Sequence, residues 1–429
     1  MNCTLLITQE RNDLRMKRER TILYIFICAL ILVSFSNTVM AEGVVQPSSA
    51  IETKIDTDQK AQTISFTLDD AIKLAEEHSY LLKQFYLDQE KLEMQNDDLR
   101  SIRTMTDKQL EQYFKVQSMD PTRTKSITDI KTETMILKEV TAEQLNTSVT
   151  QMVYQEQMIR LQIKAEVEKA YFSVLELRDQ EKNLQTALAN MESILKKTEI
   201  SFKNGLVSKF DLTSAEIEKK KLNNQLEQLK AQRNVAEMGL NQLLGLPLDR
   251  HIDLAEPAFQ PKEMAFSLAE LKEIAFTHRP DYLSQEAAAR FAQKMSDIYK
   301  KYYTYVTKEA EKVKREKEID AEKEKLKMDK VKEDIVLQVA QAYSLYQSNV
   351  LQWESKQSDV TKAEESYRIA LARYENGLST LDQLLSAKLQ LDQARSAEVS
   401  GKFEVWKSIS QLSQAVGIDL ASLGDVDQQ

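Results

Sequence analysis

Apolar residues recur at helical spacing from residue 66 onward, beginning with Leu68, Ile72 and Ala75. Thr67 stands immediately before this stripe, where its hydroxyl can accept a hydrogen bond from a free amide of the first helical turn. The same arrangement returns 200 residues later, with Ser267 in the capping position. Both stripes predict the start of a helix. Four positions carry the same residue type 200 residues apart: Phe66, Leu68, Ala75 and His78 correspond to Phe266, Leu268, Ala275 and His278.

A second, longer match runs without a gap from residue 165 to residue 245, at a constant offset of 172 residues. Unrelated amphipathic helices seldom keep a turn, an aromatic residue and a terminal glycine in register together, so we infer a duplicated unit. The matched groups are Val167, Ala170 and Tyr171 with Val339, Ala342 and Tyr343; Asn204, Gly205 and Leu206 with Asn376, Gly377 and Leu378; Leu212, Ser214 and Ala215 with Leu384, Ser386 and Ala387; and Leu240, Gln242 and Gly245 with Leu412, Gln414 and Gly417.

Each repeat is predicted to contain three helices, most clearly in the second copy. One helix is expected from about residue 268 to residue 303, a long one to about residue 374, and a third from residue 381 to Val416. Gly377 follows the long helix and suits the left-handed conformation of a C-cap. A helix of about 65–70 residues spans roughly 100 Å at 1.5 Å per residue. So thin a module cannot bury its apolar stripe alone, and it needs the other repeat and other subunits as lateral partners.

The N-terminal segment has the pattern of a secretory signal. A basic stretch ending at Arg20 precedes an apolar run over residues 22–35, and Ala41 offers a small-residue cleavage site. The run is short for a bilayer span, which favours a cleaved signal over the alternative of an uncleaved membrane anchor. The start of translation is left open between Met1 and Met16. We divide the chain into a signal peptide (1–41), a flexible lead-in (42–64), a first repeat (65–245), a linker (246–265), a second repeat (266–420) and a tail (421–429).

Composition narrows the classes of function. Only 8 of the 429 residues are glycine and 6 are proline, so long helices with few turns are expected. The net charge of −9, without a compact basic patch beyond the N-terminus, disfavours nucleic-acid binding. The histidines lack neighbours at zinc spacing, and the chain has neither a phosphate-binding glycine loop nor a nucleophile elbow, so no enzyme and no cofactor are predicted. Both cysteines, Cys3 and Cys28, fall in the predicted signal.

Four pairs of phrases recur in the same order in the two repeats: FTLDDAIKLAEEH and FSLAELKEIAFTH, VEKAYFSVLELRD and VAQAYSLYQSN, SFKNGLVSKFDLTSAE and ARYENGLSTLDQLLSAK, and LNQLLGLPLD and LSQAVGIDL. In their order and duplication, these phrases resemble the TolC-type outer-membrane efflux protein family over about residues 65–420. The resemblance implies an all-α fold in which two tandem repeats of long coiled-coil helices form half-tubes of a trimeric α-barrel. It also implies a homotrimer that docks a periplasmic-type adaptor protein and, through it, an inner-membrane pump.

The same resemblance assigns a role to the two glycine turns, which in the family face the adaptor. The residues by themselves favour the alternative, a plain helical-hairpin turn in which the glycine is only a cap. An exposed leucine beside a serine or threonine would offer a small apolar knob with a hydroxyl group. The implied docking tips are Gly205, Leu206, Val207 and Ser208 in the first repeat, and Gly377, Leu378, Ser379 and Thr380 in the second.

A pore constriction just past the tips is also implied, because the family narrows its tube there with carboxylates. Asp211, six residues after the first turn glycine, matches that position, whereas the second repeat has Gln383. Asp382 lies one position early, about 100° round the helix. Tyr374 stands where the family has a tyrosine that helps to close the tube, and core packing is an equal alternative for it.

The chain departs from the family at the opposite end, where members insert a β-hairpin in each repeat. Residues 306–334 are dominated by lysine and glutamate at thin helical spacing, and residues 117–150 alternate too little for paired strands. We therefore expect a variant without these hairpins, exported to the cell envelope. Its location is the outer membrane by family, or the wall of a cell with a single membrane. The alternative function is a wall-associated coiled-coil scaffold that has lost transport.

Overall fold

The computed structural model describes residues 65–105, 108, 109, 112, 127–256, 266–304 and 307–420. The predicted signal, the lead-in up to residue 64 and the tail after residue 420 lie outside the described residues. Most described residues are helical, which confirms the predicted all-α fold. The elements are β1 (Ser65–Phe66), α2 (Leu68–His78), α3 (Tyr80–Thr104), α5 (Ile127–Lys203), α6 (Lys209–Leu243), β2 (Asp253–Leu254), α7 (Leu268–His278), α8 (Pro280–Tyr302), α9 (Lys308–Glu375) and α10 (Leu381–Val416).

The predicted N-caps form in both repeats. Thr67 accepts a hydrogen bond from the amide of Asp70 at 3.2 Å, and the Asp70 carboxylate bonds back to the Thr67 amide. Ser267 and Glu270 form the same reciprocal pair at the start of α7. These capping boxes satisfy amides that the first turn of a helix leaves free.

The prediction of one helix from residue 268 to residue 303 was wrong, because a break separates α7 from α8. Arg279 adopts an extended conformation (ψ 118°), and Pro280 is the first residue of α8. Proline has no amide hydrogen and disfavours the helical conformation of the residue before it, so the chain bends there. The first repeat bends at the equivalent Ser79 (ψ 122°) without a proline. Proline therefore favours this break but is not required for it.

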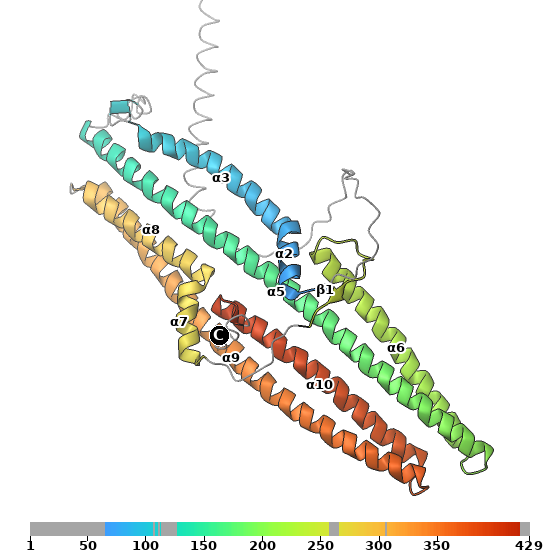
Figure 1. Cartoon of the computed structure of the whole chain (residues 1–429). Coiled ribbons are helices and arrows are strands. Elements are labelled where there is room, and N and C mark those ends of the chain that lie inside the picture. Colours follow the sequence, from blue (N-terminus) through green and yellow to red (C-terminus); the bar gives the residue numbers. More distant parts are fainter. Residues whose placement is uncertain are drawn as a thin grey trace, which may run out of the picture. The chain divides into compact units, whose positions relative to one another are not determined.

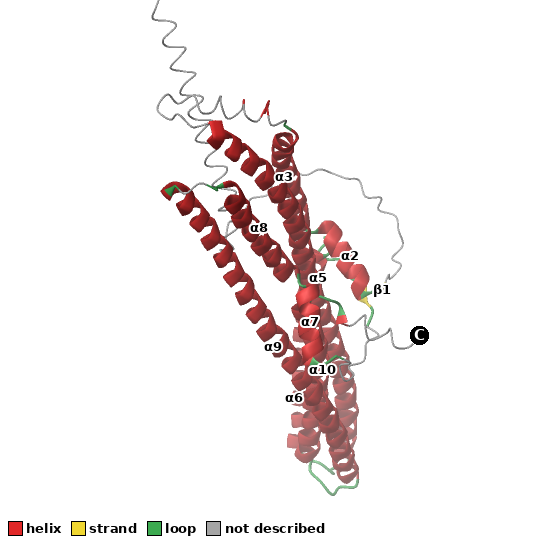
Figure 2. Cartoon of the chain, turned by 90° about the vertical axis from the view of Figure 1, so that its left-hand side faces the viewer, coloured by secondary structure: helices red, strands yellow, loops and turns green. Residues whose placement is uncertain are grey.

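The four longest helices lie side by side in the order α6, α5, α10, α9 (Figure 1). α5 has 77 residues and α9 has 68, so they span about 115 Å and about 100 Å at 1.5 Å per residue. α3 packs along one half of α5, and α8 packs against both α5 and α9, as Figure 2 also shows. None of the helices in the described ranges has an apolar stretch of the length needed to cross a membrane.

Two apolar clusters, built from equivalent positions of the two repeats, hold the row together. In the first repeat, Tyr171 and Leu175 of α5 are fully buried beside Leu240 of α6. Phe403 and Trp406 of α10 belong to the same cluster, so the second repeat packs directly against the first. A separate cluster joins α7, α9 and the end of α10 within the second repeat. Burial of large apolar side chains is the main favourable contribution to this packing.

A two-residue pair of parallel strands closes the first repeat. Ser65 pairs with Asp253 and Phe66 with Leu254, so the chain entering α2 is bonded to the linker that follows α6. These strands are the whole strand content of the described residues.

Candidate functional site

The turns between α5 and α6 and between α9 and α10 lie at the same end of the helical row (Figure 1). Gly205 and Gly377 have φ values of 70° and 71°, in the left-handed region that suits glycine. In each turn the glycine amide bonds three residues back and the following leucine amide bonds five residues back, which is the Schellman arrangement. The four bonds are Gly205 N to Phe202 O, Leu206 N to Ser201 O, Gly377 N to Tyr374 O and Leu378 N to Arg373 O, at 2.8–3.0 Å.

A capping box follows each turn and begins the next helix, α6 or α10. Ser208 accepts from the amide of Asp211 at 3.1 Å, and the Asp211 carboxylate accepts from the amide and hydroxyl of Ser208 at 2.9 and 2.7 Å. Thr380 and Gln383 make the equivalent pair, with both bonds at 3.3 Å. Only two residues lie between each turn glycine and the capping residue of the next helix, so both turns are short and closely similar in backbone.

The residue after each glycine is exposed, although leucine usually is not. Leu206 is 75% exposed and Leu378 is 77% exposed. Val207 and Ser379, which follow them, are half-buried, and the hydroxyl oxygen of Ser379 is buried without a hydrogen-bond partner. Each turn thus presents one apolar side chain to solvent beside one that packs inward.

Contacts between the repeats hold the two turns close together. Leu381 and Leu384 of α10 are buried against Met191 and Ile194 of α5. The Lys197 ammonium lies 2.5 Å from a carboxylate oxygen of Glu375, and the hydroxyl oxygens of Thr198 and Tyr374 are 3.2 Å apart. The two knobs therefore belong to one surface at one end of the chain.

The three candidate constriction residues have different surroundings. Asp211 is half-buried and engaged in its capping box, and Asp382 is exposed in the first turn of α10. Tyr374 is half-buried against the apolar cluster beneath the turns and contacts Thr198. The Asp211 carboxylate is therefore held in place by its hydrogen bonds to Ser208, whereas the Asp382 side chain is exposed to solvent.

A buried ion pair lies a few turns from the second tip, and sequence reasoning missed it. Lys388 is almost fully buried, and its ammonium lies 2.5 and 2.6 Å from the two carboxylate oxygens of Asp392. It lines a cavity of about 380 Å³ between α5, α6 and α10, together with glutamines of all three helices. The sequence offers one sign of this pair, a lysine and an aspartate four residues apart on a helix. Exposed ion pairs on helices have the same spacing, so the sign does not reveal burial.

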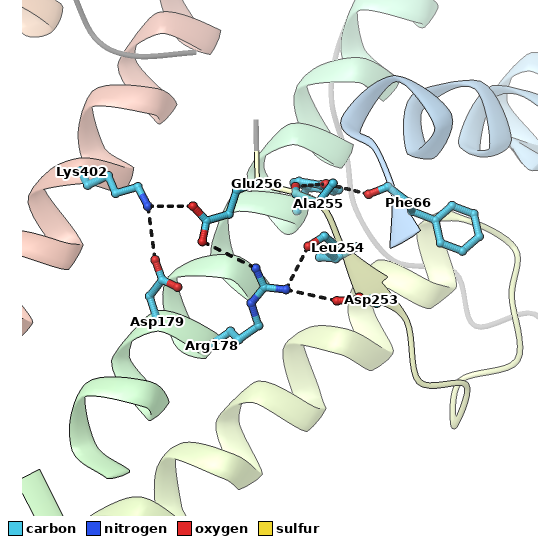
Figure 3. Close-up of polar contacts among 9 residues, drawn as sticks. Phe66, Arg178, Asp179, Asp253, Leu254, Ala255, Glu256 and Lys402 are labelled. Atoms are coloured by element: carbon cyan, nitrogen blue, oxygen red, sulfur yellow. Dashed lines mark hydrogen bonds and ion pairs between the residues drawn. The ribbon is translucent and has the colours of Figure 1, made fainter. Parts of the chain in front are cut away.

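A polar network joins the linker to α5 of the first repeat and α10 of the second (Figure 3). Arg178 of α5 donates to the carbonyl of Leu254 at 2.9 Å and lies 3.4 Å from Asp253. Glu256 bridges Arg178 and Lys402 of α10, at 3.9 and 3.4 Å. These charges are partly exposed, so they position the linker more than they stabilise the fold.

The fold is that of the TolC-type channels, as solved structures show. It matches the outer membrane protein VceC from Vibrio cholerae with a TM-score of 0.63 and 14% identity over 82% of this chain and 96% of that one. It matches the Campylobacter jejuni CmeC outer membrane channel with a TM-score of 0.62 and 13% identity, covering 88% and 94%. The Neisseria gonorrhoeae MtrE outer membrane channel gives 0.60 and 14%, covering 89% and 99%.

The family follows from the sequence itself. Residues 142–246 and 314–418 each match the family model described as outer membrane efflux protein, and the two stretches are 172 residues apart at both ends. This is the offset of the internal repeat, so the family model recognises both copies. The chain belongs to the outer membrane efflux protein family. Comparison with curated protein sequences gave no match.

Proposed function

We propose that the chain is a subunit of an export conduit, a homotrimeric helical tube through which substrates pass without chemical change. The family supports an efflux role, and the row of long helices lying side by side supports a tube wall made by copies of the same chain. The tube would lie in the cell envelope, with the outer membrane as the location typical of the family and the wall of a single-membrane cell as the alternative.

A more specific part of the proposal concerns the two glycine turns, where a partner protein would dock. Two turns of matching backbone, each with a leucine about three-quarters exposed, lie at the same end of the row, where contacts join α5 to the end of α9. Three copies would present six such knobs, which suits a partner with repeated apolar pockets. We propose that this partner is the adaptor protein of an inner-membrane pump. Gly205, Leu206, Val207 and Ser208 would form one contact, and Gly377, Leu378, Ser379 and Thr380 the other.

We further propose that Asp211, Tyr374 and Asp382 narrow the tube just past the tips. The support is their position within two turns of the tip glycines and, for Tyr374, its contact with α5 of the other repeat. Asp211 would serve both as the cap of α6 and as part of this constriction.

The docking proposal is tested with the double variant Leu206→Asp and Leu378→Asp. Burial of a leucine contributes about 1.5–3 kcal/mol, so affinity for the adaptor should fall at least tenfold for each knob lost. Leu326→Asp is the matched control, since Leu326 is 68% exposed on α9 and lies about 75 Å from the turn at 1.5 Å per residue. Co-purification of the adaptor with the control but not with the double variant supports docking; equal recovery with both excludes it.

The alternative, a structural scaffold that has lost transport, predicts a different pattern. A scaffold would retain its assembly and its envelope location, and changes at the tips would leave export of toxic compounds unaffected. Measuring drug tolerance of cells that carry the double variant separates the two functions, because a conduit with unoccupied tips should lose tolerance.

A further inference from the structure

The two glycine turns share a backbone but carry different side chains at equivalent positions. Lys203, two residues before the first turn glycine, corresponds to Glu375, and Phe210, five residues after that glycine, corresponds to Asp382. All four residues are exposed. The duplication therefore kept the fold of the turn but not its surface chemistry.

The first tip has the larger exposed apolar surface. Leu206 is 75% exposed and Phe210 is 69% exposed, within five residues of each other. At the second tip Leu378 is the counterpart of Leu206, but Asp382 stands in place of the phenylalanine. Phenylalanine is enriched in the buried centres of protein interfaces, so an exposed one beside an exposed leucine favours a contact surface.

The first tip is also basic. Between residues 201 and 211 it has two lysines, Lys203 and Lys209, and one acidic residue, Asp211. The Asp211 carboxylate accepts hydrogen bonds from Ser208 in the capping box. Both lysines are exposed, and neither forms an ion pair within the part of the chain that the structure describes. Two positive charges are therefore available to a partner at this tip.

The second tip has the opposite balance of charge. In the equivalent stretch, residues 373–383, it has Arg373 and two carboxylates, Glu375 and Asp382. The carboxylate of Glu375 pairs with Lys197 at 2.5 Å, whereas Asp382 has no ion pair among the described residues. The free carboxylate of Asp382 thus lies at the place where the first tip has the ring of Phe210.

We propose that the tips are two chemically different docking sites. The first binds an apolar segment that carries carboxylates, and the second binds a basic segment through a smaller apolar contact. The inference rests on the proposed docking function and states the chemistry of the partner. Opposite charges across an interface favour the matched pairing, and like charges disfavour the exchanged one. A partner with two contact segments therefore docks in one register, with each segment on its own tip.

Two synthetic helical peptides test the charges on the full chain. Both carry leucines along one face, and the polar face carries glutamates in the acidic peptide and lysines in the basic one. In fluorescence anisotropy, Lys203→Glu with Lys209→Glu should weaken binding of the acidic peptide about tenfold, because two attractions become repulsions. The matched control is Lys308→Glu with Lys312→Glu, whose lysines are exposed near the start of α9, and it should bind as the wild type does.

The second tip is tested with the basic peptide. Asp382→Lys should weaken its binding about threefold to tenfold, since one exposed charge is reversed. Glu309→Lys is the matched control, because Glu309 is also an exposed acid in the first turn of a helix. Equal losses of affinity in the two variants would mean that the basic peptide responds only to the total charge of the chain.

The apolar part of the first site depends on Phe210. Phe210→Ser should weaken the acidic peptide about tenfold, because most of the buried ring area is lost. Ile217→Ser is the matched control, since Ile217 is 61% exposed further along α6. Mass photometry of the same variants checks their assembly. A lower assembly mass in Phe210→Ser alone would assign this ring to a contact between copies and remove it from the docking site.

A transplant tests whether these side chains are sufficient. Glu375→Lys with Asp382→Phe gives the second tip the residues that the first tip has at the equivalent positions. Lys197→Gln is added so that the new lysine does not face a like charge, and Lys197→Gln alone is the control. Titration of the acidic peptide should show one site for each chain in the control and two in the transplant.

The outcomes separate this inference from the docking proposal on which it rests. If neither peptide binds, or if the tip variants and their controls bind equally, the assignment of chemistry to the two tips is wrong. Docking then still depends on recovery of the adaptor with Leu206→Asp and Leu378→Asp. If that recovery equals the recovery with the Leu326→Asp control, docking itself fails.

Discussion

The phenolic oxygen of Tyr171 lies 2.8 Å from the carbonyl oxygen of Phe66, 105 residues earlier in the chain. It also lies 2.5 Å from the carbonyl oxygen of Ala255 in the linker. One fully buried tyrosine on α5 thus holds both strands that close the first repeat. Burial raises the pKa of Tyr171 to about 12.

Replacing this hydroxyl should destabilise the first repeat. In Tyr171→Phe the carbonyls of Phe66 and Ala255 lose the hydroxyl hydrogen that they share, and only the Phe66 carbonyl keeps another donor, the Ala255 amide at 3.0 Å. This loss should cost about 1–3 kcal/mol in the free energy of unfolding. The control is Tyr343→Phe, at the equivalent place in α9, whose hydroxyl has no hydrogen-bond partner among the described residues. Urea unfolding followed by circular dichroism measures both, and equal effects would contradict the assigned role.

Replacing Gly205 and Gly239 with alanine should change the stability of the protein in opposite directions. Gly205→Ala places a side chain at φ 70° and should cost about 1–2 kcal/mol, although a Cβ there meets no neighbouring atom. Gly239→Ala lies inside α6, where a Cβ also meets no atom, and should stabilise the helix by about 0.5–1 kcal/mol. Thermal unfolding of the two variants measures the difference, and a change of the same sign in both would refute the explanation from backbone conformation.

The two roles of Asp211 can be separated by charge. Asp211→Gln keeps the capping box, as Gln383 does in the second repeat, and should leave stability almost unchanged. Ser208→Ala keeps the charge but removes the cap, and should cost about 1 kcal/mol. If copies of Asp211 form a charged ring, only Asp211→Gln lowers cation selectivity in single-channel recordings. Unchanged selectivity in that variant would leave capping as the sole role of Asp211.

Glu168 should make stability depend on pH at the joint between the repeats. Burial raises the pKa of its carboxyl above the ordinary 4.5, with the hydroxyl of Ser410 and the ammonium of Lys164 opposing the shift. The native state therefore holds this proton more tightly than the unfolded state, and stability falls as pH rises from 4.5 through the higher native value.

The variant Glu168→Gln removes this titration, and the second repeat also lacks a carboxyl at the equivalent position, Ala340. We expect Glu168→Gln to be more stable than the wild type at pH 7, and the advantage to disappear below the ordinary carboxyl pKa of 4.5. Urea midpoints measured from about pH 4 to about pH 8 check the sign. A variant less stable than the wild type at pH 7 would mean that the ionised carboxylate contributes more through Lys164 than burial costs.

The helices, their caps and both glycine turns could be predicted from the sequence because each depends on a few neighbouring residues. Gly377 shows this, since a glycine after a long stripe is sufficient for its Schellman turn. The break at Ser79 could not, because serine occurs inside helices as well as before them, and only the structure shows its hydroxyl accepting from the amide of Leu82 at 3.3 Å. The buried pair of Lys388 and Asp392 was missed for a related reason, since spacing alone does not distinguish a buried pair from an exposed one.

The sequence by itself determined the duplication, the helical class and the position of the tips, because periodicity and turn chemistry are local properties repeated at a fixed offset. Tertiary structure decided which surfaces of these repeated helices are covered. Phe172 and Trp406 meet because α5 and α10 become neighbours. Their counterparts at the repeat offset of 172 residues, Ser344 and Asn234, lie on α9 and α6, the two outer helices of the row. Nearly equivalent sequences acquire different surroundings because a row of helices has two edges, and only packing in three dimensions decides which helices form them.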